Sequence, residues 1–248
     1  PILPQDAFKL GGSAFGQVLN TIGSDTPNVQ SAAYVKTVFN TLQELIQNNK
    51  IVAGHDVASG GLITTLLELC FSDTNIGADL NFNALNEADS IKLLFSENSG
   101  IVFQATDTSI EAELSKASIE FHNIGTVTNK ATLNITNAAD TWSLDVSDLR
   151  DVWYETSFLL DQKQTANGLA KKRFDNYKNQ PLKYTFPEQF TGKLPQLSLE
   201  NRPKAAIIRE KGSNSEREMA NAMYLAGFDV KDVHMTDLIS GRETLEDI

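Results

Sequence analysis

The sequence predicts an α+β fold built around one main lobe. Helical and strand patterns follow one another without the strict alternation that an α/β domain shows. Of the 248 residues, 41% are hydrophobic, which is enough to bury a sizeable core. Shifts in composition divide the chain into an α+β lobe over residues 5–146, a helix with a polar connector over 147–202, and an α/β segment over 203–248.

The first lobe is predicted to begin with an amphipathic helix over about residues 30–49. Its apolar side chains recur at helical spacing, and we expect them to face the core: Val35, Val38, Phe39, Leu42, Leu45 and Ile46. A second helix is expected over 62–71, with Ser59 as its N-terminal cap. The other expected elements are a helix over 110–117 and strands over 51–53, 78–82, 101–105, 124–127, 131–135 and 142–146.

The predicted connector opens with one more helix. Its apolar positions are Leu149, Val152, Trp153 and Leu160, and the stretch 162–202 that follows is polar and contains three prolines. A basic cluster at residues 171–173 has two interpretations, a contact with phosphate or a solvated turn, and the solvated turn is favoured.

The last segment indicates a single βαβ unit. Its parts are a strand over 204–209, a helix over 215–226 and a strand over 229–235. Ser215 and Glu218 have the spacing of a capping box, and Gly227 suits the C-terminal cap. Because one such unit cannot cover both faces of a parallel sheet, we expect a truncated α/β domain and a chain that is a piece of a longer protein.

Charge and composition exclude several classes of protein. The formal net charge of −11 disfavours nucleic acid as a partner. The sequence has no apolar run of about 20 residues and no basic segment followed by an apolar one at its start, so neither a membrane nor export is expected. The single cysteine, Cys70, rules out an intrachain disulfide, and a cytoplasmic location is expected.

The stretch 55–62 (HDVASGGL) is where a strand is predicted to meet a helix. Its glycines, Gly60 and Gly61, allow a ligand to approach the backbone, and unpaired N–H groups of a first helical turn favour an anion such as phosphate. Asp56 can hold the divalent cation that accompanies polyphosphate, or it can cap the turn. Packing alone explains most Gly-Gly turns, so the bend by itself leaves a nucleotide site and an ordinary turn open.

Further motifs accompany this bend in a fixed order. They are residues 10–16 (LGGSAFG), 94–100 (LFSENSG), 209–216 (REKGSNSE) and 232–238 (DVHMTDL). Together the motifs resemble phosphoribosylformylglycinamidine synthase of purine biosynthesis, in the large single-chain form with a C-terminal glutaminase domain. The resemblance implies an aminoimidazole-ribonucleotide-synthetase-like C-terminal lobe, then the connector, then the first βαβ unit of a truncated flavodoxin-like class I glutamine amidotransferase domain.

The resemblance also implies roles for particular residues. Asp56 matches the family's magnesium-binding aspartate, and the implied nucleotide-binding residues are Ala58, Ser59, Gly60, Gly61 and Glu97. The family usually has the pattern HDxSDGG here, so a hydroxyl contact to ATP is lost at Ala58 while a backbone contact survives. Glu97 has an alternative role, the solvation of a loop before a strand. His122, His234 and Cys70 are expected to be structural.

The implied activity is that of a ligase that uses Mg²⁺ and ATP. It converts formylglycinamide ribonucleotide, glutamine and ATP to formylglycinamidine ribonucleotide, glutamate, ADP and phosphate. ATP would be a substrate, and a second, structural nucleotide is a further possibility. The implied partners are nucleotide substrates and the missing upstream and downstream domains of the same chain. We expect the fragment itself to be inactive, with no catalytic residue of its own. The alternative is a non-catalytic scaffold or a structural nucleotide-binding module.

Overall fold

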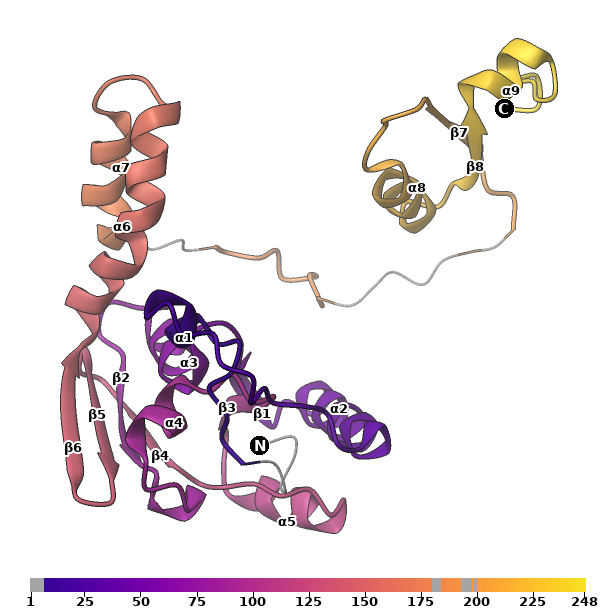
Figure 1. The fold of residues 1–248 in the computed structure, drawn as a ribbon. Helices are drawn as coiled ribbons and strands as arrows, with labels where there is room; N and C mark the ends of the chain where they lie inside the picture. The colour runs from indigo at the N-terminus through magenta and orange to yellow at the C-terminus, as the bar shows by residue number, and fades with distance from the viewer. Residues whose placement is uncertain (1–6, 180–183, 193–197, 199) are drawn as a thin grey trace. The chain divides into compact units, whose positions relative to one another are not determined.

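The chain divides into two compact units, residues 1–181 and residues 182–248, and each is considered by itself (Figure 1). The computed structural model describes residues 7–179, 184–192, 198 and 200–248. Mixed helices and strands fill the first unit, and a short parallel sheet with helices forms the second. The α+β class predicted from the sequence is therefore correct.

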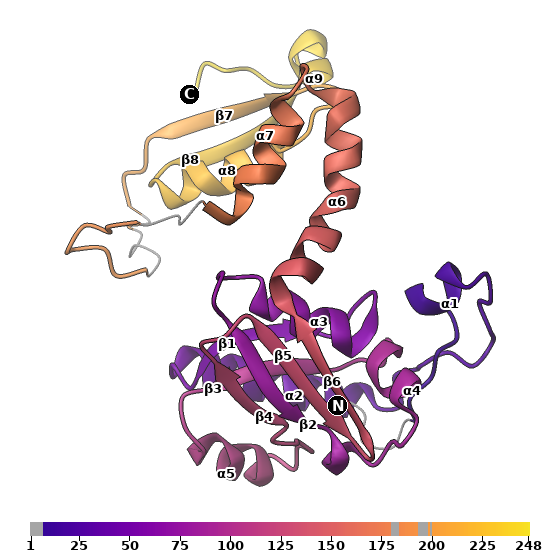
Figure 2. The same cartoon turned by 90° about the vertical axis from the view of Figure 1, so that its left-hand side faces the viewer.

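A four-stranded mixed sheet forms one part of the first unit. Its strand order is β4-β2-β5-β6, in which β2 and β5 are parallel and the other neighbours are antiparallel. Figure 2 shows β5 and β6 side by side, with β6 leading directly into helix α6. The strands are β2 (Gly77–Asn81), β4 (Gly125–Thr128), β5 (Thr132–Asn137) and β6 (Asp140–Asp145).

A second, two-stranded sheet carries the predicted bend at its end. Strand β1 (Ile51–Asp56) pairs antiparallel with β3 (Ile101–Ala105), and Asp56 lies opposite Ile101. Helix α3 (Gly61–Cys70) follows β1 after a four-residue bend. This is the strand-to-helix junction that the sequence predicts.

The first unit has two apolar cores. One gathers α3 and the four-stranded sheet around fully buried side chains such as Phe82 and Leu133. The other lies between α2 (Ala32–Gln47) and α5 (Ser109–Lys116). On α2 the buried side chains are Val38, Leu42 and Leu45. Each core therefore rests on a helix that the sequence predicts.

The predicted inward face of α2 is only partly correct. Phe39 is 60% exposed and Ile46 is 49% exposed. Both lie one position beyond a buried residue, and one position corresponds to about 100° around a helix, so they fall outside the narrow line that meets the core. The sequence pattern overestimated the width of the buried face.

Several short helices were not predicted, because they have too few turns to show a helical repeat of apolar residues. Helix α4 is an example, because its short apolar run resembles a strand. Its N-terminal cap is Asp89, whose Oδ1 accepts hydrogen bonds from the Ile91 and Lys92 N–H groups. The helices that were not predicted are α1 (Ala14–Val18), η1 (Asn83–Leu85), α4 (Ser90–Phe95), α7 (Leu169–Asn176), η2 (Tyr177–Asn179) and α9 (Met235–Ser240).

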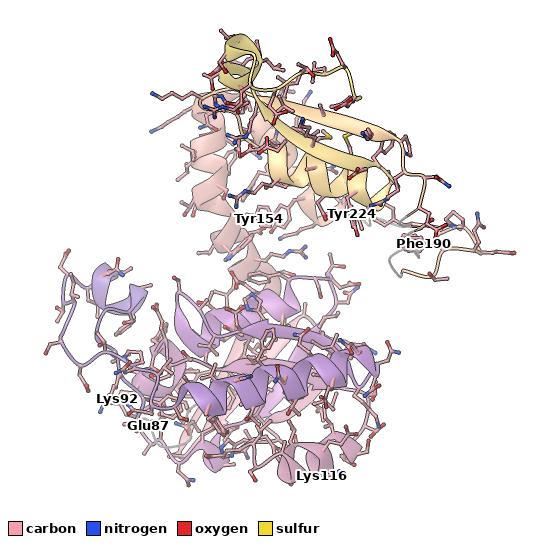
Figure 3. The ribbon with its side chains drawn as sticks, turned by 90° about the vertical axis from the view of Figure 1, so that its right-hand side faces the viewer. Glu87, Lys92, Lys116, Tyr154, Phe190 and Tyr224 are labelled. Carbon is pink, nitrogen blue, oxygen red and sulfur yellow. The ribbon has the colours of Figure 1, made fainter. Side chains whose placement is uncertain are left out.

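Helices α6 (Val146–Gln164) and α7 pack as a pair through aromatic rings. Tyr154, labelled in Figure 3, stacks on Tyr177 with ring centroids 4.0 Å apart, and Phe158 stacks on Phe174 at 4.7 Å. The basic cluster 171–173 is exposed, as favoured, but it lies on helix α7 and not in a turn. The first part of the polar stretch 162–202 is therefore a helix packed on its predecessor.

Both side-chain caps predicted from the sequence are wrong. Helix α3 has Gly60 at its N-cap position with φ of 90°, and Ser59 makes no cap bond. Ser215 also has a positive φ, 66°, and makes no cap bond to α8 (Glu216–Leu225). Ser59 lies one residue before the cap position that Gly60 occupies, and Ser215 lacks the extended backbone that a side-chain cap usually has.

The second unit contains the predicted βαβ unit. Strands β7 (Lys204–Arg209) and β8 (Asp229–His234) pair in parallel, with α8 between them in sequence. Gly227 adopts φ of 98° after the helix, as predicted for its C-terminal cap. Figure 3 labels Tyr224 on α8, whose ring lies 4.2 Å from the Arg202 guanidinium carbon.

Candidate functional site

Three of the sequence motifs meet at the end of β1. The segments 10–16, 55–62 and 94–100 are joined there by hydrogen bonds and ring contacts. The motif 209–216 belongs to the second unit. The first unit therefore assembles one site from segments that are up to 83 residues apart in sequence.

The bend between β1 and α3 is held in shape by two left-handed glycines. Gly60 has φ of 90° and Gly61 has φ of 74°, a conformation that residues with a side chain rarely adopt. A Cβ added at Gly61 would lie 2.7 Å from the Leu94 carbonyl oxygen and 2.8 Å from the Phe95 Cα. The glycine pair is thus required by the backbone itself and by its close approach to α4.

Glu97 ties the three segments together. Its Oε1 accepts a hydrogen bond from the Ala14 N–H at 2.7 Å and another from the Gly60 N–H at 2.9 Å. These N–H groups belong to the starts of α1 and α3, where an unpaired donor attracts negative charge. The Glu97 carboxylate therefore occupies a position that an anion would otherwise fill, and it does more than solvate a loop.

Neighbouring residues strengthen this junction. Asn98 accepts a hydrogen bond from the Lys9 N–H at 3.1 Å and donates one to the Ala7 carbonyl at 2.9 Å. The Phe15 and Phe95 rings stack with centroids 4.7 Å apart. Ser13 caps α1 by accepting a hydrogen bond from the Gly16 N–H at 3.2 Å. The segment 10–16 thus lies against the candidate site, as the resemblance implies.

The Asp56 carboxylate is open to solvent. Its side chain is 76% exposed, and the His55 imidazole lies beside it, with Nδ1 3.7 Å from Oδ1. Among the residues that the structure describes, no backbone N–H is bonded to this carboxylate, so the alternative that Asp56 caps the turn is wrong. The same described part of the chain has no cluster of three acidic, histidine or cysteine side chains that can hold a metal.

One carboxylate is still compatible with magnesium. Mg²⁺ commonly binds through one or two carboxylates, substrate phosphates and several waters rather than through an all-protein cage. Asp56 fits this pattern as a single ligand that needs phosphate and further groups to complete the coordination. The donor set on this chain therefore fits part of a magnesium site.

His55 lies on the other side of the strand, in a network with two helices. Its Nδ1 is 2.7 Å from the Asp56 carbonyl oxygen, and its Nε2 is 3.1 Å from Glu68 Oε2 on α3. The other oxygen of Glu68 accepts a hydrogen bond from the Trp153 indole N–H on α6 at 2.9 Å. Sequence reasoning missed Glu68 and Trp153, although Glu68 stands thirteen positions after His55, on the helix that follows the bend.

A cavity of about 690 Å³ lies inside the first unit, and its lining takes residues from both apolar cores. Ser96 lines it, and the Ser96 hydroxyl is buried with no hydrogen-bond partner. The lining contains none of the six predicted site residues. The cavity still reaches the bend, because Val57 lines it together with Asn98 and Gly100 of the segment 94–100.

The remaining candidates have structural roles. His234 caps α9, with Nδ1 accepting a hydrogen bond from the Thr236 N–H at 3.2 Å. His122 Nε2 lies 3.3 Å from Glu120 Oε1. Cys70 is buried, and desolvation raises the pKa of its thiol, which disfavours a reactive thiolate. The structure confirms that Cys70 packs in the core.

Two family models match the chain. One is described as the C-terminal domain of AIR synthase related protein and matches residues 8–136, which is more than half of the chain. The other is described as a CobB/CobQ-like glutamine amidotransferase domain and matches residues 202–248. The chain therefore belongs to the AIR synthase related family, and an amidotransferase-like segment follows the family's C-terminal domain.

Curated relatives carry a more specific name, phosphoribosylformylglycinamidine synthase. The chain is 36% identical to the probable chloroplastic/mitochondrial protein of Arabidopsis thaliana over 96% of its own length and 17% of that relative. It is 32% identical to the human protein, over 94% of this chain and 18% of the relative. It is 33% identical to the Schizosaccharomyces pombe protein, over 96% of this chain and 19% of the relative. These relatives confirm the resemblance predicted from the motifs, and the chain spans less than a fifth of their length.

Solved structures of PurL from Thermotoga maritima are also similar. The complex with FGAR has a TM-score of 0.44 and 18% identity over 52% of this chain and 22% of the other. The complex with ATP has a TM-score of 0.43 and 14% identity over 56% of this chain and 23% of the other. Likeness at these scores says nothing about the ligands of this chain.

Proposed function

We propose that this chain is a segment of an ATP-dependent ligase that makes formylglycinamidine ribonucleotide with glutamine as nitrogen donor. The observation that carries the proposal is the convergence of three motifs at a bend whose carboxylate, Asp56, stays exposed. The names of the relatives agree with this activity. The chain spans only part of their length, so the activity belongs to a longer polypeptide.

Within this proposal the site residues divide into two groups. Ala58 and Ser59 are exposed, and no acceptor within the described structure pairs with their backbone N–H groups, so these N–H groups contact the nucleotide phosphates. The Gly60 N–H is already bonded to Glu97. Gly60, Gly61 and Glu97 therefore support the bend that the nucleotide contacts.

Asp56 is the proposed magnesium ligand. Bound there with ATP, magnesium would neutralise charge on the phosphates. The residues of this chain would orient the nucleotide through fixed backbone dipoles, which need no rearrangement when charge develops. Ala58 has no hydroxyl, so its contribution is limited to the main chain.

The segment alone is proposed to be inactive. Its only cysteine, Cys70, is buried within α3, so no cysteine nucleophile is available for glutamine hydrolysis. The predicted domain boundaries at 146 and 202 and the cytoplasmic location also remain proposals. Within the described structure no helix has the length and apolar character needed to span a membrane.

The Ala58 departure favours one alternative, a lobe that holds a nucleotide without turning it over. Both functions place Asp56 near the nucleotide, but only the catalytic one makes turnover depend on it. The test is Asp56→Asn in the full-length polypeptide, with ligase turnover followed across a magnesium titration. We expect the concentration of magnesium needed for half-maximal turnover to rise about tenfold or more.

Two other outcomes decide against parts of this proposal. Unchanged kinetics across the titration removes Asp56 from the site. A lower melting temperature with turnover intact favours the non-catalytic module.

A further inference from the structure

A single carboxylate on α3 joins two other elements of the first unit. Glu68 Oε2 lies 3.1 Å from His55 Nε2 on β1, and Glu68 Oε1 accepts the Trp153 indole N–H on α6 at 2.9 Å. The Glu68 side chain is 26% exposed and that of His55 is 32% exposed. A half-buried carboxylate bonded through both oxygens to different elements fixes the position of each relative to the other.

The main chain at Asp56 receives the other end of this network. The Asp56 carbonyl oxygen lies 2.7 Å from His55 Nδ1 and accepts a second hydrogen bond from Thr65 Oγ1 at 3.0 Å. The next N–H, of Val57, donates to the Gly100 carbonyl at 2.8 Å. Both groups of the peptide between Asp56 and Val57 are thus held, while the Asp56 carboxylate stays exposed to solvent.

Helix α6 supplies the far end of the network. The Trp153 ring contacts Phe71 with centroids 5.8 Å apart and Tyr154 at 4.9 Å. Tyr154 stacks in turn on Tyr177, which follows α7. Two neighbouring rings therefore contact the indole while its N–H donates to Glu68.

We propose that Glu68 is a positioning residue of the candidate site, which links Trp153 on α6 to His55 and so fixes the backbone from which the Asp56 carboxylate projects. This inference rests on the proposed function, in which Asp56 binds magnesium. Glu68 touches neither metal nor nucleotide. It acts through His55, as outer groups commonly orient the residues that bind a metal.

The test uses the full-length polypeptide with Glu68→Gln, Glu68→Ala and Trp153→Phe. Glu68→Gln removes the charge and Glu68→Ala removes the whole carboxylate, while Trp153→Phe removes the N–H donor with part of the ring and keeps an aromatic side chain. The matched control is Trp142→Phe, because Trp142 is the other of the two tryptophans and its indole N–H has no hydrogen-bond partner within the described residues. Asp56→Asn is measured in parallel.

The readouts are the magnesium concentration for half-maximal turnover, kcat at saturating magnesium, and the melting temperature. We expect Glu68→Ala to raise the magnesium requirement about tenfold and to lower kcat by less than about threefold, since saturating metal restores the bound state. Glu68→Gln and Trp153→Phe should give smaller shifts in the same direction. Trp142→Phe should leave the magnesium requirement unchanged.

The outcomes separate this inference from the proposed function. If Asp56→Asn shifts the magnesium requirement and Glu68→Gln does not, the positioning role is wrong and the proposed function stands. If Asp56→Asn has no effect on that requirement, the proposed function itself fails. If the Glu68 variants change only the melting temperature, Glu68 is structural and the inference is overturned.

Discussion

At the scale of single residues, the candidate site depends on contacts made by backbone groups. Gly61 lies against the backbone of α4, and Glu97 accepts two N–H groups from segments that are distant in sequence. One substitution can perturb each feature: a methyl added at Gly61, or the carboxylate removed at Glu97. Substitutions at Gly61 and at Glu97 therefore test separately how the bend is held.

Gly61→Ala should be strongly destabilising. A left-handed alanine costs roughly 1–2 kcal/mol, and forcing a methyl into a packed site adds typically about 1–3 kcal/mol. The matched control is Gly168→Ala, because Gly168 has a similar φ of 82° with nothing within 4 Å of its added Cβ. Urea unfolding should show a larger loss for Gly61→Ala, and equal losses would show that the close approach to α4 is wrong.

Glu97→Ala should loosen the junction of the three segments. Two backbone N–H groups lose their acceptor, and a partly buried donor left unpaired costs about 1–3 kcal/mol. Glu97→Gln keeps an acceptor oxygen and should lose less. Hydrogen exchange at Ala14 and Gly60 checks this, since both amides should exchange faster in Glu97→Ala. Protection as in the unmodified chain would contradict the assigned bonds.

At the scale of elements, pattern length decides how well sequence predicts structure. The helix at 32–47 and the strand at 101–105 have clear periods or clear apolar runs and were predicted closely. The cap at Ser59 failed because α3 begins one residue later, after Gly60, and the cap at Ser215 failed because that residue has a left-handed backbone torsion that the sequence pattern does not report. Of the site, the bend was predictable, whereas the network through Glu68 and Trp153 depends on the packing of α6 and was not.

The pair of helices α6 and α7 is tied by an acidic residue whose charge should make its stability depend on pH. Burial acts to raise the pKa of the Asp151 carboxyl, but hydrogen bonds from Lys178, at 2.6 Å, and from Tyr177 outweigh it and hold the pKa below its ordinary value of 3.8. A carboxyl with a lowered pKa stabilises the folded chain above its ordinary value. That contribution is lost as the pH falls through the lower, folded value.

Asp151→Asn should therefore make the melting temperature depend less on pH in the acid range. The melting temperature of the unmodified chain should fall more steeply below about pH 4 than that of the variant. Asp175→Asn serves as the control, because Asp175 pairs with Lys171 on an exposed face of α7, where an ion pair contributes little. Parallel curves for Asp151→Asn and the unmodified chain would contradict the assignment.

At the scale of the whole molecule, the proposed function makes this chain one part of a larger enzyme. The first unit presents an exposed carboxylate and a glycine bend, and within the described residues no other side chains complete a metal cluster there. The net charge of −11 also makes a lone phosphate site unfavourable without a bound cation. Under the proposed function, a pocket for magnesium and ATP at this bend would need groups from elsewhere in the longer polypeptide.

The most direct test is a crystal structure of the full-length polypeptide with Mg²⁺ and a non-hydrolysable ATP analogue. We predict an Asp56 carboxylate oxygen about 2.0–2.1 Å from the metal. The phosphates should lie within hydrogen-bond distance of the Ala58 or Ser59 N–H groups. A metal and nucleotide bound at other residues, with Asp56 left in solvent, would contradict the proposed site.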